Sequence, residues 1–298
     1  MANPLISNHH KKNGKYTKAF LKQNGPGDAR PTALDILKDN NRIGTMSFFS
    51  PGPLEESALK PVVHSRQLGG KVYLGVRDLE KGEQALKEIL EPGRVELLEL
   101  DVGSLESVRT AAKTFLSKST QLNVLDNNAS TADFQSHVVN VSSAGHHMSS
   151  VILDNINLDG EYETWKAYKN AKTACIWMKN EIDRRYGSKG LHGLSLMPGG
   201  IFTGLQRHVD PETLKQWGSS EPAQKYDKNA AQGAATTITA AFGKEWEGKG
   251  DVYLEDCQEA GPVPEGGTLA VGVAPHAFDP EGERRLWSLS LKLLNLSE

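Results

Sequence analysis

Residues 71–101 read KVYLGVRDLEKGEQALKEILEPGRVELLELD, and this stretch decides the fold class. KVYLGVR is a short apolar run rich in strand-forming residues, and RVELLELD is a second one. Between them, apolar residues recur at the helical spacing of Leu79, Leu86 and Leu90, and Pro92-Gly93 ends the pattern. This order predicts two parallel strands that are joined by a crossover helix.

The same alternation continues along the rest of the chain. Strands that alternate with amphipathic helices predict an α/β fold of Rossmann type, three layers thick, with a mostly parallel sheet covered on both faces. In such sheets, ligands bind beyond the carboxyl ends of the strands. Strands are predicted over 122–128, 137–143, 191–197 and 251–257, and helices over 104–119, 163–186, 228–248 and 279–296.

Length and composition set the class of protein. The chain has 298 residues, of which 38% are hydrophobic and 24% charged, as expected for one large globular domain. The polar, lysine-rich residues 1–31 predict an N-terminal tail, which leaves 32–298 for the Rossmann-type domain. A formal net charge of −3 gives no case for nucleic acid as a partner.

No apolar run is long enough to cross a bilayer, and residues 1–31 lack the apolar core of a signal peptide. Cys175 and Cys257 are the only cysteines, too few for a disulfide framework, so a cytoplasmic location is expected. His146 and His147 are adjacent and no third ligand has metal-site spacing, so no metal is expected.

The stretch TWKAYKNAKTAC (164–175) holds Tyr168 four residues before Lys172, which places both on one helix face. A free tyrosine has a pKa of about 10, and a nearby ammonium group lowers it and favours the phenolate. Ser142 and Ser143 end a predicted strand, where a hydroxyl can hold a carbonyl or alcohol oxygen. These groups suit general acid/base catalysis coupled to hydride transfer from a cofactor.

Several stretches in this order resemble the short-chain dehydrogenase/reductase family, specifically its retinol-dehydrogenase-like fungal branch. The resemblance spans about residues 71–298, and the ordered set is far more specific than any one motif. The stretches that carry it are KVYLGVRDLEKG, LELDVGSLESVR, NVLDNNAS, VVNVSSAGH, AYKNAKTACIWMKNEIDRRYG, SLMPGGIFTGL, YLEDCQEA and APHAFDPEGERRLWSLSLKLL.

The resemblance implies an NAD(P)-dependent oxidoreductase that interconverts an alcohol and a ketone or aldehyde. It matches Ser143, Tyr168 and Lys172 to the catalytic set, and it favours Tyr168 over the equally spaced Tyr162. A small-molecule alcohol or carbonyl compound would be the substrate, residues 203–228 a mobile wall over it, and a homo-oligomer is a further expectation. Cofactor-binding residues would be Arg77, Asp101, Asn128, Ala129, Tyr168, Lys172, Ile201 and Thr203.

Two of these residues have simpler alternative roles. Arg77 matches the cation that the family uses for a 2′-phosphate, which favours NADP, but Asp78 beside it leaves NAD open. Arg77 is equally consistent with a surface ion pair to Asp78 or Glu80. Asp101 either contacts the adenine or only caps the turn before SLESVR.

The chain departs from the family pattern in two places. The glycine-rich phosphate loop is not found, and its position offers Pro51 and Pro53, which lack an N–H, followed by the acidic Glu55 and Glu56. Only a few residues separate NVLDNNAS from HVVNVSS, whereas adjacent parallel strands need a crossover of about a dozen or more. The sequence therefore predicts a sheet that is incomplete at its first strand and fourth crossover. The alternative function is a non-catalytic relic with weak or no cofactor binding.

Overall fold

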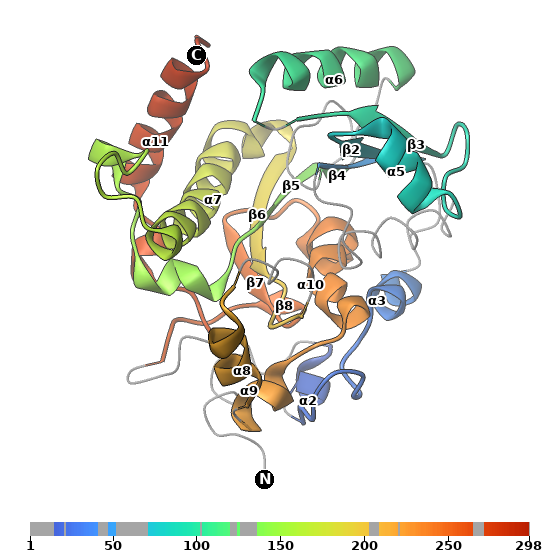
Figure 1. The fold of residues 1–298 in the computed structure, drawn as a ribbon, viewed down its shortest axis with the longest axis vertical. Coiled ribbons are helices and arrows are strands. Elements are labelled where there is room, and N and C mark those ends of the chain that lie inside the picture. The colour runs from blue at the N-terminus through green and yellow to red at the C-terminus, as the bar shows by residue number, and fades with distance from the viewer. Residues whose placement is uncertain are drawn as a thin grey trace.

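A parallel sheet forms the centre of the molecule (Figure 1). The computed structural model describes residues 15–20, 22–40, 47–51, 71–101, 103–119, 124–125, 136–202, 209–219, 221–264 and 271–297. The strand order is β3-β2-β1-β4-β5-β6-β7-β8, in which only the β7–β8 pair is antiparallel. The predicted α/β, Rossmann-type, mostly parallel fold is thereby confirmed.

The strands follow the predicted apolar runs. Their bounds are β1 Ser47–Pro51, β2 Lys71–Val76, β3 Val95–Glu99, β4 Val124–Leu125, β5 Ser136–Val141, β6 Leu191–Met197, β7 Val252–Glu255 and β8 Gln258–Glu259.

Helices connect and cover these strands. The α-helices are α2 Thr17–Phe20, α3 Ala33–Asn40, α5 Leu79–Leu86, α6 Leu105–Lys118, α7 Thr164–Tyr186, α8 Pro211–Ser219, α9 Glu221–Tyr226, α10 Ala230–Phe242 and α11 Pro280–Leu293. Short 3-10 helices are η1 Ala144–Met148, η2 Leu153–Asn155, η3 Gly187–Lys189, η5 Lys244–Trp246 and η6 Pro275–Ala277.

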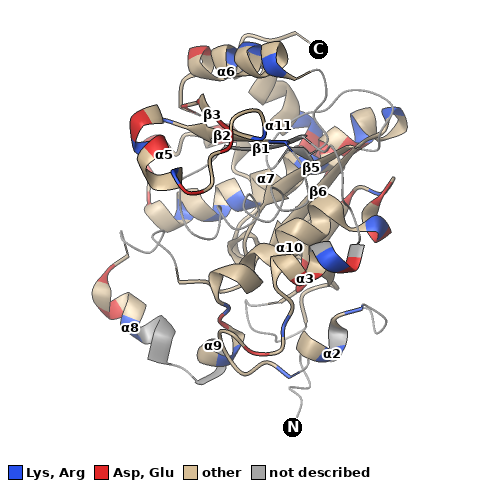
Figure 2. Cartoon of the chain, turned by 90° about the vertical axis from the view of Figure 1, so that its right-hand side faces the viewer, with Lys and Arg blue, Asp and Glu red and all other residues tan. Residues whose placement is uncertain are grey.

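The two faces of the sheet carry separate apolar cores. On one face, Leu74 of β2 packs in a cluster with Ile36 of α3 and Ile238 of α10, and Figure 2 shows these two helices side by side. On the other face, Tyr73 of β2 meets Phe115 of α6, with ring centroids 5.0 Å apart. Successive β2 residues thus point to opposite faces, as a sheet buried on both sides requires.

The first strand is present, so the expected gap at this strand is not observed. β1 lies between β2 and β4 and is parallel to both, with Phe49 opposite Tyr73 and Leu125. The position of the glycine loop, within residues 52–70, lies outside the described residues. β4 and β5 are adjacent and parallel, and the ten residues 126–135 that connect them also lie outside the described part.

The expected N-terminal tail is packed against the domain over its described part. Phe20 is 1% exposed and joins the core cluster of α10. Arg30 is 2% exposed, and its guanidinium donates to the backbone oxygens of Tyr226 and Asp227 at 2.9 and 2.6 Å. The prediction of a tail is therefore wrong for these described residues. Arg30 can be buried because carbonyl groups far along the chain accept its hydrogen bonds.

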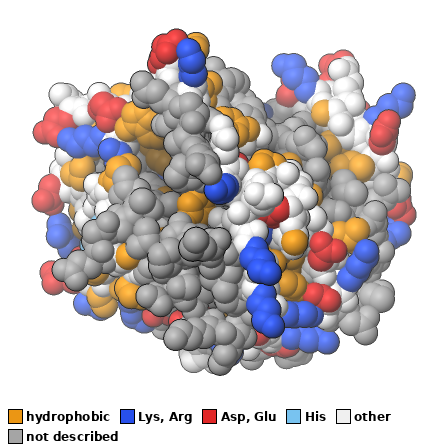
Figure 3. Space-filling model, turned by 90° about the horizontal axis from the view of Figure 1, so that it is seen from below, with side chains coloured by type: hydrophobic (Ala, Val, Ile, Leu, Met, Phe, Trp, Pro, Cys, Tyr) orange, Lys and Arg blue, Asp and Glu red, His pale blue; other side chains and the backbone are white. Residues whose placement is uncertain are grey.

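Charges of both signs and hydrophobic side chains are mixed on the surface seen from below (Figure 3). None of the helices in the described ranges combines the length and apolar character that crossing a membrane would require.

Candidate active site

Ser143, Tyr168 and Lys172 come from two elements at the carboxyl edge of the sheet. Ser143 lies two residues beyond β5 and caps the 3-10 helix η1. Tyr168 and Lys172 lie near the start of α7, whose first residues are capped by the carboxylate of Glu163. The cap fixes where the helix begins, and therefore which turn meets the end of β5.

The structure brings Tyr168 and Ser143 to the same point, which is marked by Gly145. A Cβ on Gly145 would lie 2.9 Å from Cε1 of Tyr168 and 3.6 Å from Oγ of Ser143. Gly145 also donates its N–H to Ser143 Oγ at 3.1 Å. Only a residue without a side chain leaves the Tyr168 ring this close to the serine turn.

Lys172 joins this pair from the same face of α7. Its ammonium group lies 5.5 Å from the centroid of the Tyr168 ring and donates to the backbone oxygen of Val141 at 3.1 Å. The three groups predicted from the sequence thus occupy one region of the molecule.

The two neighbouring serines have different environments. Ser142 is 2% exposed, and its hydroxyl donates to the backbone oxygen of Lys172 at 2.7 Å. Ser143 is half-buried, and among the contacts of the described residues its hydroxyl only accepts, from Gly145. Its hydrogen is therefore available to a substrate oxygen, whereas that of Ser142 fastens β5 to α7.

A second pair, Tyr162 and Lys166, has the same four-residue spacing as Tyr168 and Lys172. This duplicate pair lies on the surface. Tyr162 is 71% exposed and precedes α7, and Lys166 pairs with the exposed carboxylate of Glu161. Trp165, one turn before Tyr168, places its ring edge-on to the Tyr168 ring at 5.7 Å. Neither member of the duplicate pair shares the position of the Tyr168–Lys172 pair beside the serine turn.

The carboxyl ends of β2 and β3 carry Arg77 and Asp101, and both residues are exposed. Asp78 is the N-cap of α5: it accepts the N–H of Lys81 at 3.0 Å and pairs with the Lys81 ammonium at 3.2 Å. Asp101 Oδ1 accepts the N–H of Gly103 at 2.9 Å, which is the turn-capping alternative. Asn128, Ala129 and Thr203 lie outside the described residues.

Ile201 follows the turn Pro198-Gly199-Gly200 after β6. Its side chain packs on α10, where a Cβ on Gly233 would lie 2.1 Å from Ile201 Cδ1. Its backbone forms an isolated bridge with Lys228, so residues 202–227 leave and return at the carboxyl end of β6. The described helices α8 and α9 belong to this excursion, the stretch expected to form the substrate wall.

Lys228 is a residue that sequence reasoning did not single out. Its buried ammonium donates to the backbone oxygen of Pro198 at 3.0 Å and to Asp256 Oδ1 at 2.7 Å. Its side chain lies against Gly199, whose φ of +107° is a conformation that favours glycine. Lys228 therefore holds the turn that follows β6, a role with no local sequence signal because its partners are 28 and 30 residues away.

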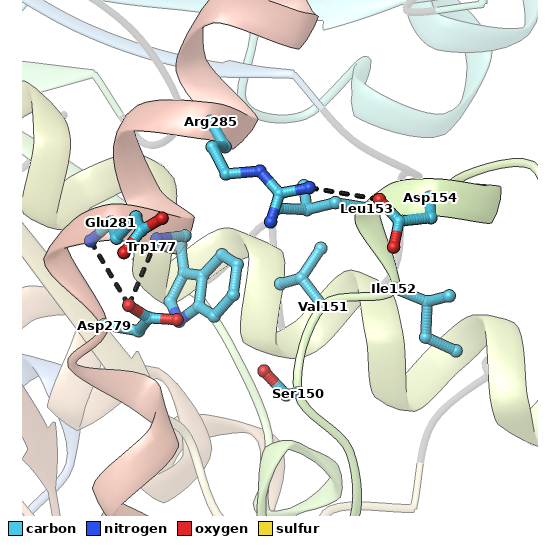
Figure 4. A pocket seen from close by; sticks show the side chains of 10 residues that line it. Ser150, Val151, Ile152, Leu153, Asp154, Trp177, Asp279, Glu281 and Arg285 are labelled. Carbon is cyan, nitrogen blue, oxygen red and sulfur yellow. Dashed lines mark hydrogen bonds and ion pairs between the residues drawn. The ribbon is translucent and has the colours of Figure 1, made fainter.

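A separate pocket of about 400 Å³ lies between η2, α7 and α11 (Figure 4). Trp177 forms part of its lining, and Arg285 Nη2 donates to Asp154 Oδ1 at 3.0 Å. Asp279 in its lining caps α11 through the N–H groups of Glu281 and Gly282. None of the three candidate catalytic residues lines this pocket, so it is distinct from the site at Gly145.

The chain is similar to known oxidoreductases, although no family model matches it. It is 73% identical to the short-chain dehydrogenase/reductase prx1 of Penicillium rubens, with 100% of both chains aligned over 340 positions. That is 42 positions more than this chain has residues. It is 34% identical to the oxidoreductase calI of Penicillium decumbens over 331 positions, which cover 91% of this chain and 94% of that one.

Solved structures share the fold at low identity. An uncharacterised protein from Mycobacterium paratuberculosis aligns with a TM-score of 0.63 at 22% identity, covering 90% of this chain and 99% of that one. The NADPH-bound carbonyl reductase from chicken fatty liver aligns with a TM-score of 0.51 at 15% identity, covering 73% and 99% of the two chains. Both likenesses concern the architecture of the sheet and its helices.

Proposed function

Because this chain belongs to the short-chain dehydrogenase/reductase family of oxidoreductases, we propose that it interconverts an alcohol and a ketone or aldehyde with NADP. The observation that carries the proposal is the meeting of the Tyr168 ring and the Ser143 hydroxyl at Gly145, with the Lys172 ammonium beside the ring. Acid, orienting hydroxyl and cation are the groups that proton transfer to or from a substrate oxygen requires.

In this proposal the cofactor supplies or accepts the hydride, and the protein handles the oxygen and its proton. Ser143 donates its hydroxyl hydrogen to the substrate oxygen and so holds the reacting carbon in place. In reduction, Tyr168 gives its phenolic proton to the oxygen as negative charge develops there; in oxidation it takes that proton back. Lys172 places its positive charge beside the Tyr168 ring, 5.5 Å from the ring centroid.

The described residues fit a phosphorylated dinucleotide better than NAD. The Asp78 carboxylate already caps α5 and pairs with Lys81, so part of its capacity to accept hydrogen bonds is used within the protein. Arg77, exposed at the end of β2, offers a cation where a 2′-phosphate would lie. NADPH is also the molecule bound to the chicken carbonyl reductase of similar fold. We propose Asn128, Ala129, Asp101, Ile201 and Thr203 as further contacts along the cofactor.

The test is an NADPH fluorescence titration combined with turnover of a panel of carbonyl compounds. We expect saturable binding, and a Tyr168→Phe variant that binds NADPH with unchanged affinity but loses at least about 100-fold in kcat. Tyr162→Phe is the matched control, because it removes the same hydroxyl from the duplicate pair, and it should keep wild-type kcat. Equal kcat in the Tyr168→Phe variant would rule out this acid/base assignment.

A second function class is a non-catalytic relative of these enzymes. Two observations favour it. The alignment with prx1 has 42 positions more than this chain has residues, and only ten residues link the parallel strands β4 and β5, where a crossover of about a dozen or more is usual. The prolines at 51 and 53 also lack the N–H groups that a phosphate needs. Absence of NADPH binding at millimolar concentration would support this alternative against the enzyme.

The two cysteines carry the proposal for the cellular location of the protein. Cys175 and Cys257 are both free, and burial raises the pKa of the Cys257 thiol to about 11. Two unpaired thiols are compatible with the reducing cytoplasm, which we propose as the location, with assembly into a homo-oligomer as a further proposal.

A further inference from the structure

The residue that holds the serine turn from behind is His146. Its ring is fully buried, at 0% exposure, in the turn that directly follows Ser143. Its Nδ1 lies 2.6 Å from the backbone oxygen of Ser143, and the same oxygen accepts the His146 N–H at 3.1 Å. Two hydrogen bonds from one residue thus fix the backbone of Ser143.

The partners of His146 determine its protonation. The backbone N–H of Ala274 can only donate, and it lies 3.1 Å from Nε2, so Nε2 must be the acceptor. The hydrogen of the neutral ring is then on Nδ1, and the Ser143 oxygen can only accept it. Nδ1 also lies 3.5 Å from the Tyr253 hydroxyl, and together the two ring nitrogens link Ser143 to a residue 128 positions along the chain.

The far partner belongs to a segment, residues 271–277, that is itself tied to this turn. His147 Nε2 donates to the backbone oxygen of Gly272 at 2.8 Å, and His276 Nε2 donates to the backbone oxygen of His146 at 2.7 Å. The buried Glu255 carboxylate accepts the Gly272 N–H at 2.9 and 3.0 Å. The segment therefore offers Ala274 to His146 from a fixed position.

We propose that His146 is a positioning residue of the catalytic set: its Nδ1–H holds the Ser143 carbonyl and thereby aims the Ser143 hydroxyl at the point where Tyr168 acts. The inference rests on the proposed function. Among the described residues, the hydroxyl of Ser143 forms its hydrogen bond within its own turn, with Gly145, so its direction depends on how that turn is held. Misplacement of a reacting group by about 1 Å can cost about 100-fold in rate.

Two substitutions separate the two ring bonds of His146. His146→Asn keeps an amide nitrogen near the place of Nδ1, which can donate to the Ser143 oxygen, but cannot reach Ala274. His146→Gln places its amide near Nε2, where its oxygen can accept from Ala274, but leaves the Ser143 oxygen without the side-chain donor. Both lose one bond of one buried ring, so a merely structural role predicts similar losses in the two variants.

We expect kcat to fall by about 10- to 100-fold in His146→Gln and by less than about threefold in His146→Asn, with NADPH affinity unchanged in both. His147→Asn is the matched control, because it weakens the same segment through Gly272 but leaves the Ser143 oxygen with its donor, and it should lose less than about threefold in kcat. Equal losses in the Asn and Gln variants, or a wild-type rate in His146→Gln, would overturn the positioning role.

Hydrogen–deuterium exchange of residues 143–148 gives a readout that needs neither cofactor nor substrate. Exchange should accelerate in His146→Gln and stay at the wild-type rate in His146→Asn and His147→Asn. The same exchange in all variants overturns the link between His146 and Ser143, whatever their activity. If the variants show the expected exchange pattern while the wild-type protein turns over no substrate, that result would support the link between His146 and Ser143 and overturn the proposed function.

Discussion

Ser142 and Ser143 are neighbours in the chain, but the end of a strand turns their side chains in opposite directions. The hydroxyl of Ser142 is buried between β5 and α7, where it bonds Lys172 and also contacts the Tyr253 hydroxyl. The hydroxyl of Ser143 stands beside Tyr168 at Gly145. In the proposed function, Ser142 therefore contributes to the assembly of the site and Ser143 to its chemistry.

Alanine at each of the two positions should separate these roles. Ser143→Ala should lower kcat by at least about 100-fold, and it should cost about 0.5–1 kcal/mol of stability because the cap of η1 is lost. Ser142→Ala should cost about 1 kcal/mol of stability, because a buried hydrogen bond is lost, and should keep most of the activity. Urea unfolding and steady-state kinetics on both variants measure this; the reverse pattern would exchange the two assignments.

The buried ring of His146 makes stability depend on pH. Burial lowers its pKa from 6.5 to about 4, and the neighbouring His147 and His276 act in the same direction, although the Ser143 bond opposes them. The unfolded chain therefore binds more protons between these values, and stability is complete above pH 6.5 and falls as the pH falls toward 4. The shift corresponds to about 3 kcal/mol.

Urea unfolding of wild type and His146→Gln at several pH values between 4 and 7 checks this dependence. Across this range, His146 should lower the free energy of unfolding of the wild-type protein by about 3 kcal/mol. The total loss in the variant should be smaller by that amount. Parallel slopes in the two proteins would mean that the His146 ring binds its proton equally in the folded and unfolded states, which would refute the effect of burial.

At the scale of elements, the sequence predicted those whose start is encoded locally. The helix expected over 163–186 is found as Thr164–Tyr186 because the Glu163 carboxylate caps it, and Asp78 and Ser104 do the same for α5 and α6. In the same way, the spacing of Tyr168 and Lys172 was enough to place them together. His146 and Lys228 were missed as site residues, because their partners lie far along the chain.

The N-terminal segment shows the opposite case. Its polar composition predicts a tail, yet Arg30 bonds four groups: the backbone oxygens of Gly25, Tyr226 and Asp227, and the Asp28 carboxylate. A polar composition indicates that a segment cannot bury its polar groups by itself. It does not indicate whether distant carbonyl groups will bond to those polar groups in the folded protein. Two glycines with positive φ, Gly25 and Gly27, allow the turn that makes this possible.

Arg30→Met should therefore destabilise the protein by about 3 kcal/mol, since it leaves buried carbonyl groups without their donor and removes the cation that pairs with Asp28. Arg285→Met is the matched control, because Arg285 makes an exposed ion pair with Asp154 and should cost less than about 1 kcal/mol. Thermal and urea unfolding of the two variants measure the difference. Equal stability of both would mean that the N-terminal segment does not contribute to the folded core.

At the scale of the whole molecule, this chain has 42 residues fewer than the number of positions in its alignment with prx1, and the fold shows which parts of the proposed cofactor site it has. The sheet keeps its full strand order, with β1 in the centre, and the edge formed by the ends of β2, β3 and β5 carries Arg77, Asp101 and Ser143. The architecture and the proposed catalytic residues are thus present, while the phosphate loop of the family has no counterpart in the sequence. Affinity, rather than chemistry, is where such a chain is expected to be weakest.

Thermal unfolding with added nucleotide measures this affinity without a substrate. A ligand at 100 times its Kd adds about 2.7 kcal/mol to stability, which for a chain of this size raises Tm by about 5 °C or more. We expect NADPH to give the larger shift and NADH the smaller one, and Arg77→Ala to bring the NADPH shift down to that of NADH, because the cation for the 2′-phosphate is gone. Lys81→Ala is the control, since its charge lies on α5 and pairs with Asp78. Equal shifts by both nucleotides would refute the role of Arg77, and no shift at millimolar NADPH would identify the chain as the non-catalytic relative.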